Sequence, residues 1–148
     1  MADKTRRLII GISGASGVIY GIRALQLLRD TDVETHLVMS KSAEMTMGYE
    51  VKIKPSAVRE LADVAHAIGD VGASISSGSF NTMGMLVLPC SIRTMSEISS
   101  GVTSSLLSRA ADVVLKERRR LVLGVRETPL HTGHLRTLVR LSEIGAVV

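Results

Sequence analysis

Short apolar runs alternate along this chain with longer segments of helical periodicity, and this alternation limits the folds that the chain can adopt. Residues 8–12 are apolar on both faces, which is typical of a strand covered by helices on both sides. Residues 18–29 follow with apolar side chains at helical spacing, and residues 35–39 form a second apolar run. Strands that are joined through helices lie parallel, so the sequence predicts an α/β fold.

The same alternation continues along the rest of the sequence. Since no repeat, low-complexity tract or linker interrupts it, we expect one Rossmann-like or flavodoxin-like domain over residues 1–148, with a parallel sheet and helices on both faces. The further strands are predicted at residues 83–88, ended by Pro89, at 120–125, and from 146 to 148, where a strand begins. The further helices are predicted at residues 41–50, 55–67, 103–118 and about 132–143.

The composition favours an anionic ligand and argues against several classes of protein. The formal net charge is +4, but the basic residues are scattered apart from the run 116–120, and aromatic residues make up only 2%, too few to stack nucleic-acid bases. Residues 1–7 contain no secretory signal core, and no apolar run approaches the roughly 20 residues that span a bilayer. Cys90 is the only cysteine, and no zinc-ligand spacing occurs. We therefore predict a cytoplasmic protein without metal, membrane or nucleic-acid partners.

The loops that follow the predicted strands hold the candidate site, because parallel α/β sheets bind ligands beyond the carboxyl ends of their strands. The residues in these loops are small, hydroxylated or charged. The loops are residues 13–17, Ser40 with Lys41, residues 90–94 and residues 126–129.

The first loop is rich in glycine and lies between a strand and a helix. Gly14 and Gly17 let backbone N–H groups approach a phosphate or the edge of a flavin ring, although a tight turn without ligand gives the same pattern. No Gly-Lys-Ser/Thr follows, which excludes a Walker A loop. A dinucleotide site expects an acidic residue at the end of the second strand, where this chain has Ser40 and Lys41. A mononucleotide is therefore favoured over NAD.

Two hydroxyl residues three positions apart follow the strand that ends at Pro89. If a helix begins near Ser91, then Ser91 is its N-cap and Thr94 lies in its first turn. The same hydroxyl and N–H groups are suited to a flavin phosphate or ring carbonyl. Helix capping and flavin binding both stay open at this point.

Charged residues on the predicted helix 103–118 share one face. Arg109 and Lys116 lie about 10.5 Å apart along the helix axis, with Asp112 between them. Spacing alone favours a solvated face with an ion pair worth about 0.3–0.5 kcal/mol. Glu127, next to Arg126 at the end of a strand, is either a site residue or part of a surface turn.

Other chemically active residues are interpreted as structural. Cys90 has no neighbour that would lower the pKa of its thiol, so we expect a small buried residue rather than a nucleophile. The histidines show no base–nucleophile pattern, and each is expected to be structural or on the surface: His36, His66, His131 and His134.

Taken together, the loops resemble the UbiX-type flavin prenyltransferases, also called the Pad-type decarboxylase subunits. The resemblance is specific because ordered blocks of sequence carry it over nearly the whole chain. The blocks are residues 11–17 (GISGASG), 34–41 (ETHLVMSK), 74–80 (SISSGSF), 89–91 (PCS), 109–118 (RAADVVLKER) and 126–130 (RETPL).

The resemblance implies an enzyme that joins the dimethylallyl group of dimethylallyl phosphate to reduced FMN. In this family N5 of the flavin attacks the prenyl carbon as phosphate leaves, and a bond to C6 closes a fourth ring. The product, prenylated FMN, serves UbiD-type decarboxylases, the expected partners. By motif, the residues expected to bind FMN are Gly14, Ala15, Ser16, Ser40, Ser91, Ile92, Arg93, Thr94 and Arg126. The expected catalytic and prenyl-phosphate groups are Ser16, Glu50, Arg109, Lys116 and Glu127.

The resemblance also reverses the reading of the charged helix face. Metal-dependent prenyltransferases hold magnesium with aspartate-rich clusters, which this sequence lacks. Arg109 and Lys116 are therefore expected to stabilise the leaving phosphate in place of a metal. Relatives form dodecamers with sites at subunit junctions, so a large homo-oligomer is expected.

Two features depart from the family pattern. Glu50 is followed by Val51 and Lys52, where relatives often carry Thr-Asp. Relatives continue through a Pro-rich loop into a final helix that supplies a Tyr and an Arg to the prenyl phosphate, and we expect this C-terminal helix to be missing here. An FMN-binding accessory subunit of a decarboxylase is thus an alternative. A flavin-dependent cysteine decarboxylase is less favoured, because residues 89–94 lack the Asn of that family's loop and no suitable catalytic His is present.

Overall fold

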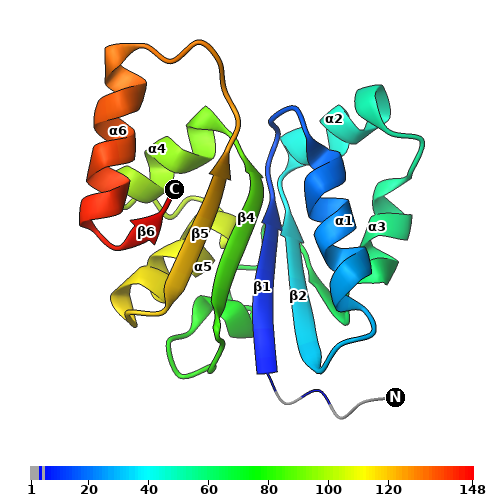
Figure 1. Ribbon diagram of the computed structural model, residues 1–148. Coiled ribbons are helices and arrows are strands. Elements are labelled where there is room, and N and C mark those ends of the chain that lie inside the picture. Colours follow the sequence, from blue (N-terminus) through cyan, green and yellow to red (C-terminus); the bar gives the residue numbers. More distant parts are fainter. Residues whose placement is uncertain (1–3, 5) are drawn as a thin grey trace.

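The computed structural model describes residue 4 and residues 6–148. Its centre is a six-stranded sheet in the order β3-β2-β1-β4-β5-β6, with parallel neighbours throughout (Figure 1). The strands are Arg6–Ile12 (β1), Val33–Met39 (β2), Val64–His66 (β3), Gly84–Cys90 (β4), Arg120–Val125 (β5) and Ala146–Val147 (β6). This order is that of a doubly wound Rossmann fold, whose topological switch point lies between β1 and β4. The predicted fold class is confirmed.

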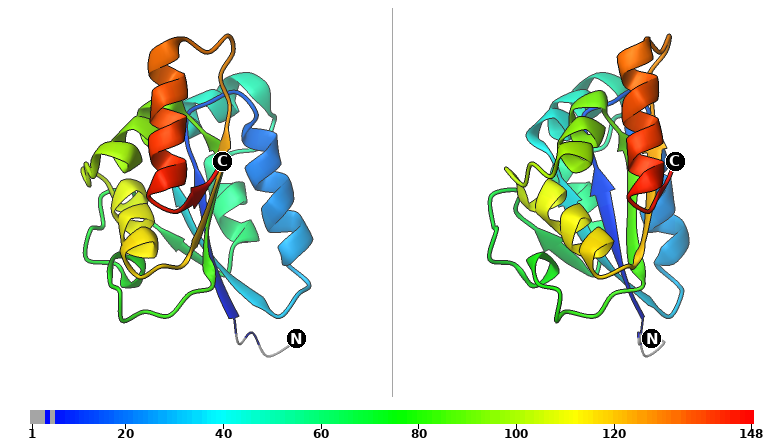
Figure 2. Two further views of the ribbon diagram at one scale, coloured as in Figure 1. Left: turned by 60° about the vertical axis from the view of Figure 1, so that its left-hand side comes forward. Right: turned by 90° about the vertical axis from the view of Figure 1, so that its left-hand side faces the viewer.

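Helices cover both faces of the sheet (Figure 2). On one face α1 packs against β1, β2 and β4 and contacts α2 and α3; on the other, α5 packs against β2, β4 and β5 and contacts α4. The last helix, α6, contacts α4 and β6. The helices are Val18–Leu28 (α1), Lys41–Glu50 (α2), Pro55–Leu61 (α3), Ile92–Ser100 (α4), Leu106–Lys116 (α5) and Thr132–Glu143 (α6), with a short 3₁₀ helix at Ser74–Ser76 (η1).

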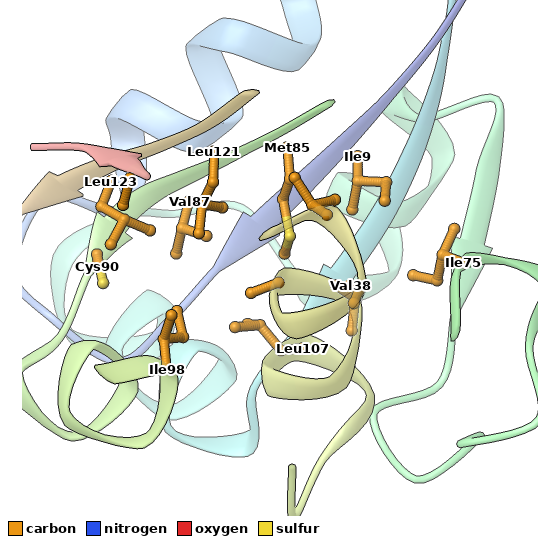
Figure 3. Close-up of a cluster of buried hydrophobic side chains, with 14 of the residues drawn as sticks. Ile9, Val38, Ile75, Met85, Val87, Cys90, Ile98, Leu107, Leu121 and Leu123 are labelled. Carbon is orange, nitrogen blue, oxygen red and sulfur yellow. The ribbon is translucent and has the colours of Figure 1, made fainter. Parts of the chain in front are cut away.

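The apolar residues of the central strands divide between two cores. Ile10 belongs to the core under α1, whereas its neighbour Ile9 belongs to the core under α5, because successive strand side chains point to opposite faces. Figure 3 shows Ile9 in this second core with Met85, Val87 and Leu107. The predicted strands are apolar on both faces because each face of the sheet is buried in a core.

A short strand replaces the end of one predicted helix. The helix predicted at 55–67 ends at Leu61, and Val64–His66 forms the edge strand β3, paired with β2. Asp63 causes the change of direction: its carboxylate accepts a hydrogen bond from the Thr35 backbone N–H at 2.8 Å, and its own N–H donates to Thr35 Oγ1 at 3.0 Å. These bonds tie residue 63 to β2, so the following residues continue along the sheet.

Strand β4 passes through the proline that was expected to end it. The strand predicted at 83–88 begins at Gly84 and ends at Cys90, and its pairing with β5 becomes irregular between Val87 and Cys90. Proline has no N–H for the ladder, which is consistent with the irregularity at this point. The start is fixed by Gly84, because a Cβ there would lie 2.1 Å from the carbonyl oxygen of Arg120.

Helix α5 is shorter at both ends than the predicted helix 103–118. It begins after Ser105, whose side chain forms a capping box with Ser108. It ends in a Schellman motif, in which Arg118 N–H donates to Leu115 O at 3.0 Å and Arg119 N–H to Val114 O at 2.9 Å. Arg118 has a φ of 55°, a conformation that glycine adopts more easily.

We expect Arg118→Gly to stabilise the protein by about 0.5–1 kcal/mol. The left-handed conformation costs a non-glycine residue about 1–2 kcal/mol, and part of this gain is offset by the greater freedom of glycine in the unfolded chain. Denaturant unfolding at a fixed protein concentration measures the difference. Arg118→Ala is the control, since it removes the side chain and keeps the strain; a Gly variant no more stable than the Ala variant would contradict this account.

Candidate functional site

A cavity of about 480 Å³ lies at the carboxyl ends of β1, β2 and β4. Its volume falls in the range of about 300–1,000 Å³ that is typical of small-molecule sites. Five of the residues predicted to bind a cofactor meet here: Gly14, Ser40, Ser91, Arg93 and Thr94. The other lining residues are Lys41, Ser42, Ile68, Gly69, Glu97, Ser104, Ser105 and Leu107.

Three helices begin at this cavity. Their N-cap residues are Ser40 for α2, Ser91 for α4 and Ser105 for α5, and each N-cap hydroxyl accepts a hydrogen bond from the backbone N–H three residues later. The predicted capping role of Ser91 is therefore confirmed. Helix N-termini carry partial positive charge and free N–H groups. Their convergence makes the cavity suited to an anion.

The charged side chains around the cavity favour the same kind of ligand. Lys41 and Arg93 both line it. Glu97 is the one acidic residue among the described lining residues, and it accepts a hydrogen bond from Arg93 Nε at 2.9 Å. This pairing offsets the carboxylate charge and leaves Lys41 with the helix dipoles to attract an anion.

The glycine-rich loop closes one side of the cavity. A Cβ on Gly14 would lie 2.3 Å from Ser42 Cβ, so only glycine allows the loop to pack this closely on the start of α2. Ala15 is buried beside it, whereas Ser16 is exposed and lies outside the cavity lining. Gly17 has a φ of +102° and begins α1. The glycine-rich loop thus makes a tight turn that borders the cavity.

A second group of predicted residues gathers at the start of α1. Glu50 Oε2 accepts a hydrogen bond from the Gly17 N–H at 2.9 Å. This bond, the Ser16 hydroxyl and the Arg126 guanidinium together hold the pKa of Glu50 below its ordinary value. Arg126 is positioned by its backbone N–H, which donates to Cys90 O at 3.1 Å. The geometry thus brings Ser16, Glu50 and Arg126 together at the rim of the sheet.

The other predicted residues do not line the cavity of the same chain; they include Ile92, Arg109, Lys116 and Glu127. Arg109 Nη1 is 3.7 Å from Asp112 Oδ2, and Lys116 Nζ donates to Glu117 Oε1 at 2.7 Å. Because α5 starts at the cavity, Lys116 lies about 16 Å further along the helix axis, near the amino end of β5. Glu127 is exposed and accepts a hydrogen bond from the Thr128 N–H at 3.1 Å.

The chain is similar to known proteins of one family. A family model for flavoproteins matches residues 1–142. Flavin prenyltransferase UbiX of Escherichia coli (strain K12) is 62% identical over 144 residues, which are 97% of this chain and 76% of that protein. The chain belongs to the UbiX-type flavin prenyltransferase family.

Two solved structures from the UbiX group superpose closely on this chain. AnUbiX (PadA1), described in complex with FMN and dimethylallyl pyrophosphate, has a TM-score of 0.95 at 54% identity, covering 96% of this chain and 76% of that one. A dodecameric FMN-dependent UbiX-like decarboxylase from Escherichia coli O157:H7 has a TM-score of 0.93 at 49% identity, covering 95% and 78%. The resemblance inferred from the sequence blocks is confirmed.

Several residues of this UbiX-family cavity were not predicted. Ile68 and Gly69 lie beyond the carboxyl end of β3. Because β3 was not predicted, their place at the cavity was not predicted either. Ser104 and Ser105 were placed inside a helix that was expected to begin at residue 103. The spacing of Ser105 and Ser108, a capping pattern before an apolar run, is the signal that identifies them.

The cysteine and two of the histidines that were interpreted as structural are buried or half-buried. Cys90 is fully buried, and burial raises the pKa of its thiol to about 12. His36 is buried between Glu34 and His66, with Nε2 2.7 Å from Glu34 Oε1 and Nδ1 3.0 Å from His66 Nε2. Burial, with His36 nearby, lowers the pKa of His66.

Within residue 4 and residues 6–148, no three His, Cys, Asp or Glu side chains gather in a way that could hold a metal ion. No helix in those residues is long and apolar enough to cross a membrane.

Proposed function

We propose that this chain is a flavin prenyltransferase, which transfers the dimethylallyl group of dimethylallyl phosphate to reduced FMN and releases phosphate. The observation that carries the proposal is the cavity at the switch point of the sheet, where three helix N-termini converge with Lys41 and Arg93. These groups fit a phosphate monoester. The position where a dinucleotide site expects a carboxylate is Ser40. The identity of the ligand as FMN, and the type of reaction, are inferred from the family to which the chain belongs.

The chain's residues have two tasks in this reaction. Bound FMN supplies the nucleophilic N5, whose bond to the prenyl carbon forms as the carbon–oxygen bond to phosphate breaks. Ser40, Ser91 and Thr94 bind and orient the flavin from the cavity, and Arg126 does so from the rim. Glu50, whose pKa is held below its ordinary value, accepts a hydrogen bond from the Gly17 N–H and so fixes the Gly17 end of the glycine loop.

We further propose that a second copy of the chain supplies the groups that bind the leaving phosphate. Arg109 and Lys116 are the cations expected there, yet Lys116 lies about 16 Å along α5 from the cavity of its own chain. A neighbouring subunit can present this end of α5 to the cavity. The dodecameric state of the UbiX-like relative supports such an arrangement.

The product and its destination follow from the same proposal. We propose that the product is prenylated FMN, in which a second bond joins flavin C6 to the prenyl group after C6 has lost its proton and the prenyl double bond has gained one. A UbiD-type decarboxylase is the proposed recipient. We propose the cytoplasm as the location, where reduced flavin and a free thiol are both maintained.

The reaction is tested by incubating the protein anaerobically with reduced FMN and dimethylallyl phosphate. We expect a single turnover to convert the flavin, with a matching change in its absorption spectrum and a mass increase equal to the prenyl group. Excess EDTA should leave the rate unchanged, because fixed cations take the place of a metal. Calorimetry should show binding of FMN and not of NAD.

Other outcomes would point to other functions. Binding of FMN without any conversion of the flavin would favour an accessory subunit of a decarboxylase. Release of CO₂ from a C-terminal cysteine peptide would favour a cysteine decarboxylase. Loss of all activity in EDTA would contradict the metal-independent mechanism.

A further inference from the structure

We propose that Ser13 is a positioning residue for the flavin, although it lies outside the cavity. Its hydroxyl donates a hydrogen bond to Pro89 O at 2.8 Å and accepts one from the Ser91 N–H at 2.8 Å. Ser13 is fully buried. One side chain therefore joins the loop after β1, which contains Gly14, to the residue that caps α4. The inference rests on the proposed FMN site.

The backbone explains why a side chain is needed at this position. Pairing between β1 and β4 extends only to Gly11 opposite Val87, and the pairing of β4 with β5 becomes irregular over the next residues. Beyond Gly11 the ladder no longer sets the distance between the two strand ends. The Ser13 hydroxyl, together with the Ser13 N–H that donates to Pro89 O at 3.2 Å, takes over that task.

The hydrogen bonds of Ser13 set the separation between two loops that line the cavity. Gly14 and Ser91 belong to different loops, and both line the cavity. Without the hydroxyl, the Ser91 N–H loses its acceptor and the loops can adopt other separations. Apparent affinity falls in proportion to the fraction of molecules that keep the binding-competent arrangement. Ser13 thus acts on the flavin through Ser91 and Gly14.

The test compares FMN affinity with stability in a set of variants. Ser13→Ala should raise the Kd for FMN about tenfold, since it removes the acceptor of the part-buried Ser91 N–H. It should also alter the visible circular dichroism of the bound flavin. Ser13→Thr keeps the hydroxyl but adds a methyl group to a filled site, so it should lower stability while leaving the Kd close to wild type.

The matched control removes a similar hydroxyl elsewhere. Thr35 is equally buried, and its Oγ1 accepts a hydrogen bond from the Asp63 N–H at 3.0 Å, away from the cavity lining. Thr35→Val should therefore lower stability without changing the Kd. If Ser13→Ala does not fold, Ser13→Cys, with a poor acceptor at the same position, replaces it and should weaken FMN binding.

Two results would overturn the proposal. One is a Kd for the Ala or Cys variant within twofold of wild type despite a stability loss like that of Thr35→Val. The other is a Thr variant that binds FMN as weakly as the Ala variant. Both readouts measure flavin binding, so a failure of prenyl transfer leaves them informative.

Discussion

Replacing Lys116 with alanine should lower the rate of prenyl transfer about 10²–10³-fold, because it removes one preorganised charge from the departing phosphate. FMN affinity should stay close to the wild-type value, because in the proposed site Lys116 of the neighbouring subunit contacts the prenyl phosphate and not the flavin. Single-turnover prenylation and flavin titration measure the two quantities. Arg118→Ala, which removes a cation two residues away, is the control and should keep the wild-type rate.

The same lysine allows a test of where the second half of the site comes from. Glu50→Gln and Lys116→Ala should each be inactive alone. If each site combines Glu50 of one chain with Lys116 of another, random mixed assemblies at equal amounts should regain about a quarter of wild-type activity. A mixture with no more than the summed activities of the two variants would place the whole site in one chain. If the Lys116→Ala enzyme keeps the wild-type rate, Lys116 has no catalytic role and only pairs with Glu117 on the surface.

Arg126→Ala should weaken FMN binding about tenfold or more, because a hydrogen bond to a charged group contributes roughly 1.5–3 kcal/mol. Arg126 lies at the carboxyl end of β5, close enough to Glu50 to lower the pKa of that carboxyl. Quenching of flavin fluorescence measures the affinity. The control is again Arg118→Ala, whose exposed side chain projects from the other end of the sheet.

Equal and small effects of the Arg126 and Arg118 variants would contradict the placement of the flavin at this rim. A large loss with Arg126→Ala and a normal stability would support it. The comparison is well matched, since both variants remove one exposed guanidinium from the same chain.

The central strands could be predicted because the apolar pattern of residues 8–12 and 35–39 indicates burial on both faces, and most helices could be predicted from their periodicity. Helix α4 was expected only as one alternative at Ser91. Strand β3 could not, because its three residues are partly exposed and lie at the edge of the sheet. Its pairing depends on bonds between Asp63 and Thr35, residues far apart in the sequence. Pro89 misled the prediction of β4, since the structure accommodates it by irregular pairing with β5.

Some residues of the candidate site could be predicted from the sequence and others could not. Gly14, Ser40 and Ser91 follow strands, so parallel topology alone predicted that they would meet. Ser105 reaches the cavity from a helix start, for which its spacing to Ser108 is the local signal. Ser13 acts through contacts with Pro89 O and the Ser91 N–H, which lie far from it in the sequence and have no local signature. The separation of Lys116 from the cavity also depends on the direction of α5, which spacing on a helix face does not reveal.

Because Cys90 is buried at the end of β4, the reactivity of its thiol can be used to measure local opening of the sheet. Burial raises the pKa of the thiol to about 12, so the reactive thiolate is scarce at neutral pH. Alkylating reagents therefore modify Cys90 only when the centre of the sheet has separated and water reaches the sulfur. Since Cys90 ends β4 directly before Ser91, its rate of labelling follows the loosening of the strand end on which the cavity is built.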